Sequence, residues 1–298
     1  MKIKKQQNTQ AYQVGSLIGP TTLLVTVMFL IPLLNFLRNS FNVFVPGQFM
    51  QTAWTLENYH KFLTDPYYLS ILGRSFYIAF SATLLALVMG FPIAYFLART
   101  KSKWKSIIIM LIVFPLLVGN IIRDVGWISL FSGTGLINRF LLDIGVVQEP
   151  IQLLQTPMAV IIAITNVVLP YMILTLHSVL ERIDPALEEA AYDLGASRWT
   201  VMKSIIIPLG IPGIMAGTLF VFVLSINAYT TPLVIGGSKV QMMAPALYSQ
   251  ISEVSNWPLG AAMAVILIVF TLLSSTIYLR IIERMSMNVR AAGTEVKG

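Results

Sequence analysis

Six long apolar runs, separated by shorter polar intervals, dominate the chain. Each run is close to the roughly 20 residues that an α-helix needs to cross a bilayer. We therefore predict an all-α, polytopic bundle of six transmembrane helices forming a single domain over residues 1–298. The expected spans are residues 16–37, 75–98, 107–130, 158–180, 213–235 and 259–282.

One polar interval, residues 181–212, has the pattern of two short helices rather than a loop. Asp184 followed by Pro185 is typical of a helix start, and Gly195 supplies the left-handed residue that commonly ends a helix. The apolar residues recur at the spacing of one helical face, and they are Leu187, Ala190, Ala191 and Leu194. The acidic residues Glu188, Glu189 and Asp193 fall outside this face.

A second short helix is expected to follow, capped by Ser197 and interrupted by Pro208. Periodicity alone favours an amphipathic segment packed on its own bundle or on the lipid surface. The small alanines of the first helix would let a partner backbone approach closely.

The composition identifies the class of protein. The chain is 56% hydrophobic and 11% charged, whereas a soluble domain carries roughly 25% charged residues. This is the composition of an integral membrane protein. The absence of cysteine excludes disulfides and thiolate metal sites.

The net charge of +7 follows membrane topology. If the N-terminus is cytoplasmic, fourteen of the 20 lysines and arginines fall in cytoplasmic segments and six fall outside or near outer helix ends. We therefore expect both termini and residues 181–212 in the cytoplasm. The same distribution argues against nucleic acid as a partner.

The sequence contains no set of residues that predicts catalysis or metal binding. His60 and His177 lack acidic neighbours at metal-ligand spacing, and no nucleophile and base pair is visible. The Gly236–Lys239 stretch lacks the spacing of a phosphate-binding loop. We expect no enzyme activity and no cofactor bound by this chain, so any ATP is used by a partner.

Polar residues inside the expected spans are candidates for lining a transport pathway, because such groups are costly unless they face a cavity or a partner. These candidates are Asn166, Asn227, Tyr229 and Asp124. The alternative is that they hydrogen-bond between helices. Arg123 beside Asp124 is expected to form an interfacial ion pair with it.

The polar interval also resembles the coupling loop of permease subunits in bacterial binding-protein-dependent ABC importers. The matching residues, with every spacing kept, are Glu189, Ala190, Ala191, Gly195, Ile205, Ile207 and Pro208. Ile207 stands where leucine is usual, which is a swap of similar volume. The residues Trp54 to Leu63, and the following segment from Arg74 to Thr100, also resemble this family.

The resemblance implies a MetI-like permease fold in the bacterial cytoplasmic (inner) membrane, and a coupling helix that docks on an ATPase. The implied docking residues are Leu187, Glu188, Glu189, Ala190, Ala191, Leu194, Gly195, Ile205, Ile207 and Pro208. The implied partners are a second, different permease subunit, a dimer of ATP-binding subunits that uses ATP and Mg, an extracytoplasmic solute-binding protein and membrane lipid.

The resemblance extends to the first permease subunit of spermidine/putrescine importers, which implies a polyamine substrate. Permeases for opines, aminoethylphosphonate or amino acids look similar in the same stretches, so these small amino compounds remain alternatives. An autonomous secondary transporter would carry more charged residues inside its spans. A membrane scaffold without transport is disfavoured by the coupling motif.

Overall fold

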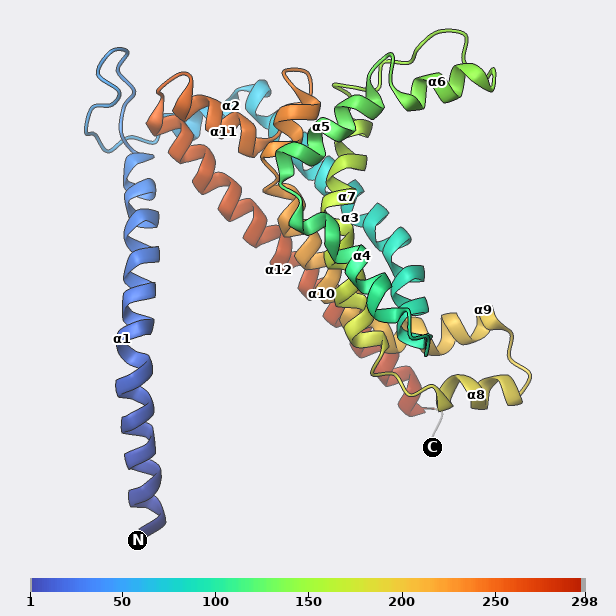
Figure 1. Ribbon diagram of the computed structural model, residues 1–298. Helices are drawn as coiled ribbons and strands as arrows, with labels where there is room; N and C mark the ends of the chain where they lie inside the picture. The colour runs from blue at the N-terminus through green and yellow to red at the C-terminus, as the bar shows by residue number, and fades with distance from the viewer. Residues whose placement is uncertain (1, 296–298) are drawn as a thin grey trace. The chain divides into compact units, whose positions relative to one another are not determined.

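The computed structural model of the 298-residue chain describes the backbone of residues 2–295 and the side chains of residues 19–280. Within this part the chain is helical, apart from turns, loops and an isolated bridge between Val43 and Gln51. The predicted all-α class is confirmed (Figure 1). The elements are α1 (Lys2–Asn39), α2 (Glu57–Thr64), α3 (Pro66–Arg99), α4 (Lys105–Leu117), α5 (Asn120–Phe131), α6 (Leu136–Asp143), α7 (Pro157–Leu180), α8 (Ala186–Asp193), α9 (Arg198–Val201), the π-helix η1 (Met202–Ile206), α10 (Ile207–Ile226), the π-helix η2 (Pro232–Gly236), α11 (Met243–Ser252) and α12 (Trp257–Glu295).

Among the described residues, 6 segments are long and apolar enough to cross a membrane. They are Gly19–Asn39, Pro66–Arg99, Asn120–Asp143, Pro157–Leu180, Arg198–Ile226 and Trp257–Arg280. Six apolar helical segments therefore occur in the predicted order.

The contacts divide the chain into two units, of which the first comprises Met1–Thr64 and Leu247–Ile266. Its α1 is apolar and 0% buried over Gly19–Asn39. A helix that is apolar all round requires lipid or another subunit as its surroundings. After α1 the chain folds back onto α2, where the Asn58 side chain donates to the carbonyls of Ser40 and Asn42 at 2.9 and 2.8 Å.

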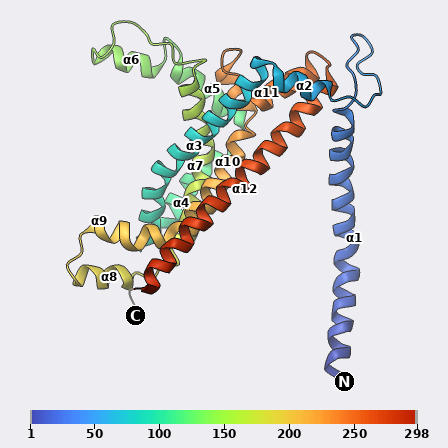
Figure 2. The same cartoon turned by 180° about the vertical axis from the view of Figure 1, so that it is seen from behind.

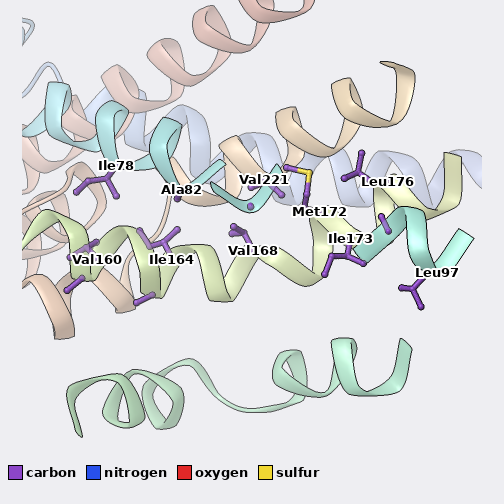
Figure 3. Packing of buried hydrophobic residues seen from close by; sticks show 14 of the residues in the cluster. Ile78, Ala82, Leu97, Val160, Ile164, Val168, Met172, Ile173, Leu176 and Val221 are labelled. Carbon is purple, nitrogen blue, oxygen red and sulfur yellow. The ribbon is translucent and has the colours of Figure 1, made fainter. Parts of the chain in front are cut away.

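The second unit, Asp65–Ala246 with Leu267–Gly298, is built around α7. Helices α3 and α10 pack along α7, and the buried side chains between them form an apolar core (Figure 3). Two glycines allow α3 and α10 to approach α7 closely. A Cβ on Gly90 of α3 would lie 3.1 Å from Met172 Cγ of α7, and one on Gly217 of α10 would lie 3.0 Å from Met172 Sδ. Small residues at helix contacts are the usual way in which membrane helices pack.

The predicted third span, residues 107–130, is wrong as a single helix. It is broken at Val118 and Gly119, which are extended, so α4 and α5 are separate helices. Pro115 lies inside the last turn of α4 and has no backbone N–H to donate. The N–H of Val118 bonds to the carbonyl of Pro115, three positions earlier, where a regular α-helix would use the carbonyl four positions earlier. Asp124 therefore lies in α5, after the break, and not in the helix that contains Pro115.

The predicted fifth span, residues 213–235, is displaced from the observed helix. The helix runs without interruption from Arg198 to Ile226, so the expectation that Pro208 interrupts it is wrong. The π-turn η1 ends where Ile207 donates to the Met202 carbonyl, and this wider turn accommodates Pro208, which follows in the first turn of α10 and has no backbone N–H to donate. The helix stops at Ile226, and residues 227–229 separate it from the turn before η2.

Two other span limits also differ. Helix α3 begins at Pro66 rather than at residue 75, because the Asp65 side chain accepts from Tyr67 N at 2.9 Å and Pro66 fits the first turn. Helix α12 continues to Glu295, beyond the predicted end at residue 282. Sequence hydropathy follows the lipid-compatible part of a helix and not its capped ends.

Within the second unit, the short helices lie at opposite ends of the α3, α7 and α10 bundle. Figure 1 shows α8 and α9 at one end and α5 and α6 at the other, and the reverse view in Figure 2 agrees.

Candidate functional site

The connection from α7 to α10 forms the two helices that its sequence predicts. Asp184 Oδ1 accepts from Ala186 N at 2.9 Å at the start of α8, and Gly195 has φ +83° at its end. Ser197 Oγ then accepts from Thr200 N at 3.2 Å and caps α9. The start, turn and cap of this segment are therefore confirmed.

Large apolar side chains of α8, of α9 and of the turn between them are exposed. Leu194 is 89% exposed, Trp199 71% and Leu187 47%, and Ala190 and Glu189 are also exposed. Ala191 differs from its neighbours, because it is only partly exposed and packs against the buried core of the second unit. The predicted face is thus open except at Ala191, and large apolar side chains open together on a helix indicate an interaction surface.

Glu188, which lies off the predicted apolar face, points inward. Its side chain is 8% exposed and its carboxylate accepts from Arg99 Nε at 2.5 Å and from the Tyr95 hydroxyl at 2.6 Å. Arg99 Nη1 also donates to the Leu180 carbonyl at 3.1 Å. We call Tyr95, Arg99 and Glu188 the Arg99 cluster.

The Arg99 cluster joins α8 to the ends of α3 and α7. A buried ion pair adds little net stability, but breaking it by removing one partner costs about 3–5 kcal/mol. From the sequence, Arg99 is only one of the basic residues that follow membrane topology, and the family resemblance implies that Glu188 is a docking residue. In the sequence, Glu188 is visible only as a glutamate off the apolar face and Arg99 only as an arginine at the end of a span. Neither position reveals that the two side chains meet.

A second, exposed ion pair lies beside the cluster. Lys105 Nζ lies 2.6 Å from Glu181 Oε1, and this hydrogen bond is the main cause that lowers the pKa of Glu181 below its ordinary 4.5. Between the two pairs lies a cavity of about 880 Å³ with charges of both signs on its walls. Its charged lining residues are Arg99, Lys101, Lys105, Glu181, Glu188, Glu189 and Arg198.

The end of the motif joins α9 to α10. Ile205 is half-buried, and Ile207 is 37% exposed. Pro208 lies in the first turn of α10 rather than at a break. Because the helix is continuous here, the exposed segment and the membrane helix form one rigid rod.

The candidate pathway residues do not form one group. Asp124 is fully buried, and its Oδ1 accepts from Thr231 Oγ1 at 3.1 Å. Asn227 is exposed at the end of α10, where its Nδ2 donates to the Val223 carbonyl at 2.8 Å. Tyr229 is half-buried in the interruption between α10 and η2, which also contains Asn227, and Thr231 follows in the turn before η2. Asn166 is half-buried within α7.

The expected ion pair between Arg123 and Asp124 is wrong. The Arg123 guanidinium donates to the Pro115 carbonyl at 3.1 Å and to Asn120 Oδ1 at 2.6 Å. Pro115 lies across the helix break in α4, and Asn120 is the first residue of α5, so both acceptors lie at a break that the prediction of one continuous helix did not include. Among the described residues Asp124 therefore has no direct ion-pair partner, and Arg123 acts on its charge only over a longer distance.

Comparison with known proteins identifies the family. The family described as "Binding-protein-dependent transport system inner membrane component" matches residues 82–287. The chain is 36% identical over 274 residues to the spermidine/putrescine transport system permease protein PotB of Salmonella typhimurium (strain SL1344), covering 92% of this chain and 95% of that one. It is 37% identical over 257 residues to PotB of Escherichia coli (strain K12), covering 86% and 93%.

Solved structures support the same fold. A chain from the crystal structure of a bacterial alginate ABC transporter in complex with an alginate pentasaccharide-bound periplasmic protein superposes with a TM-score of 0.73 at 14% identity, covering 93% of this chain and 96% of that chain. A chain from an inward-facing MetNI methionine ABC transporter gives 0.52 at 16% identity, covering 72% and 94%. In such importers the permease is non-catalytic and the ATPase is a separate subunit. The chain therefore belongs to the binding-protein-dependent transport system inner membrane component family, and it is a multi-pass permease subunit of an ABC importer.

Proposed function

We propose that this permease subunit imports polyamines such as spermidine and putrescine. The observation that carries the proposal is the 34–37% identity to three spermidine/putrescine permease proteins, over 84–92% of this chain. Permeases for other solutes are also similar to this chain, including a sulfate transport system permease protein that is 24% identical to it. Membership of the family therefore does not by itself identify the substrate, and polyamine import is proposed separately.

In the proposed mechanism, α8 is the helix that contacts the ATP-binding subunit. The exposed side of the segment, with Leu187, Glu189, Ala190 and Leu194, docks in a groove of the ATP-binding subunit, and Gly195 sets the turn. Ile205, Ile207 and Pro208 form the rigid junction to α10. Glu188 serves a different purpose from docking: because it is bound to Arg99 inside the chain, displacement of α8 is transmitted to α3 and α7.

The partners complete an importer. A second, different permease subunit pairs with this one, and a dimer of ATP-binding subunits binds ATP and Mg. An extracytoplasmic solute-binding protein delivers the substrate. Both termini and α8 lie on the cytoplasmic side, a proposal supported by fourteen of 20 lysines and arginines falling there. The two contact units work as a single permease domain in the lipid bilayer.

The substrate pathway is assigned to the polar residues of the membrane segments. Asn227 and Tyr229 lie in the interruption after α10, and Asp124 lies in α5 and contacts Thr231, which follows that interruption. Asn166 of α7 is the remaining member. Interrupted helices at membrane depth are tolerated where they line a cavity or are buried in protein, which supports this placement.

Uptake by the complete importer tests the substrate. The chain and its partner subunits are expressed in a bacterial strain that lacks polyamine uptake, and entry of radiolabelled spermidine and putrescine is measured. We expect saturable uptake that disappears when the ATP-binding subunit carries an inactivating substitution. Uptake of an opine or an amino acid without polyamine uptake would reject the proposed substrate.

A further inference from the structure

Two interrupted membrane segments meet at Asp124. The residue lies in α5, directly after the break at Val118 and Gly119, within the candidate span Asn120–Asp143. Its partner Thr231 precedes η2, directly after the interruption that ends α10. The exposed fraction of Asp124 is 0% and that of Thr231 is 5%. A carboxylate is thus enclosed at the contact between two helix breaks.

The charge of this carboxylate is only partly compensated by the protein around it, because Arg123 acts on it electrostatically without forming an ion pair. The ion pairs of the described residues do not include Asp124, and Arg123 is turned toward Pro115 and Asn120. Thr231 donates one hydrogen bond to Oδ1, while no hydrogen-bond donor in the described part reaches the buried Oδ2. A buried carboxylate requires a cation, a proton or further donors, because leaving it charged and alone is very costly.

The surroundings match the way in which transport proteins bind ions and charged substrates. Ionisable residues in membrane segments mark substrate or proton pathways, and discontinuous helices commonly form the binding site. The complement of a carboxylate with a free oxygen is an ammonium group, which donates three hydrogen bonds and carries one positive charge. Each end of a polyamine is such a group.

We propose that Asp124 binds an ammonium group of the polyamine during its passage, with Thr231 positioning the carboxylate. This inference rests on the proposed function, because it takes the polyamine as the substrate. The residue is enclosed in the present structure, so the substrate reaches it when α5 and the segment before η2 move apart. The helix breaks on both sides provide the hinges for that movement.

A purely structural role makes a different prediction. A protonated carboxyl group that only packs and hydrogen-bonds is replaced by the amide of asparagine with little loss, since the two groups have similar size and hydrogen-bonding capacity. A carboxylate that binds a cation cannot be replaced by asparagine without loss of binding, because the amide carries no charge. Asp124→Asn therefore separates the two roles, and Asp124→Glu keeps the charge.

The test measures how much spermidine the complete importer holds when it is trapped with ATP and vanadate in lipid nanodiscs, after delivery of radiolabelled spermidine by its binding protein. We expect the Asp124→Asn complex to retain at least about tenfold less label than wild type, the effect of losing one charge-assisted hydrogen bond. Asp143→Asn is the matched control, because it removes an exposed acid from the same candidate span, at the end of α6. This control should retain spermidine like the wild type.

The outcomes separate this inference from the proposed function. Equal retention by assembled Asp124→Asn and wild-type complexes would overturn the role of Asp124 while leaving polyamine import intact. Wild-type complexes that neither hold nor import spermidine would reject the substrate itself. If Asp124→Asn does not assemble, Asp124→Glu decides: it should hold about half or more of the wild-type label because its charge is retained, and an assembled Glu variant that holds none contradicts the proposal.

Discussion

At the scale of single residues, the Arg99 cluster decides how α8 is attached to the membrane bundle. Glu188 is separated from Arg99 by 89 positions, and their contact follows from the packing of α8 under the end of α3. No periodicity within residues 181–212 shows this. The exposed apolar residues of α8 were predictable from spacing, whereas the inward direction of Glu188 depends on a distant partner.

Glu188→Gln should uncouple ATP hydrolysis from uptake. The change leaves the partly buried Arg99 with a neutral partner, a defect smaller than the about 3–5 kcal/mol of a fully buried broken pair, and loosens α8 from α3. We expect spermidine uptake to fall roughly tenfold or more while the ATPase activity of the assembled complex persists, as measured by the ratio of ATP hydrolysed to spermidine imported. An unchanged ratio in an assembled complex would show that the cluster does not transmit the movement.

The neighbouring pair of Lys105 and Glu181 provides the control. It is exposed, and exposed ion pairs contribute only about 0–1 kcal/mol, so Lys105→Met should leave the coupling ratio within about twofold of wild type. Lys105 keeps the pKa of folded Glu181 below 4.5, so the pair stabilises the fold above that pH and the contribution is lost as pH falls through the folded pKa. A difference in thermal unfolding between variant and wild type that grows on acidification would contradict this sign.

At the scale of elements, the sequence predicts the capping and turn residues of the segment 181–212 better than it predicts the limits and continuity of the membrane helices. Asp184, Gly195 and Ser197 act where their local chemistry indicates, because caps and left-handed turns depend on a few neighbouring atoms. The continuity of the rod from Arg198 to Ile226 could not be predicted, since the π-turn places Pro208 where its missing amide hydrogen does no harm. Hydropathy likewise cannot locate the break at Val118, which lies inside an apolar run.

Substitutions at Gly195 test the role of the turn between α8 and α9. A Cβ at this position meets no atom within 4 Å, so a substitution is limited by the backbone and by whatever docks outside the chain. Asn and Asp both tolerate the left-handed conformation better than other residues, yet only Asp adds a charge beside the exposed Leu194. We expect Gly195→Asp to abolish uptake without preventing membrane insertion, and Gly195→Asn to keep a substantial part of it. Similar uptake by both variants would argue against a docking surface at this turn.

At the scale of the whole molecule, the chain supplies membrane helices and a coupling segment but not the ATPase. The class, the number of apolar segments and the family were all predictable, because composition and the spaced motif are properties of the sequence alone. The expectation of a polyamine substrate came from the family resemblance and not from any acid in the spans, because the sequence suggested an ion pair between Arg123 and Asp124. Only the helix break shows that Arg123 bonds elsewhere.

The central claim is that α8 contacts an ATP-binding subunit, and site-specific crosslinking tests it directly. The chain has no cysteine, so Leu194→Cys carries a photoreactive maleimide at one defined site, and Phe140→Cys on α6, which is 63% exposed at the opposite end of the bundle, is the control. On illumination of the assembled importer, we predict that Leu194→Cys joins the ATP-binding subunit and that Phe140→Cys does not. No crosslink from Leu194→Cys to that subunit, or equal crosslinking from both positions, would contradict the account.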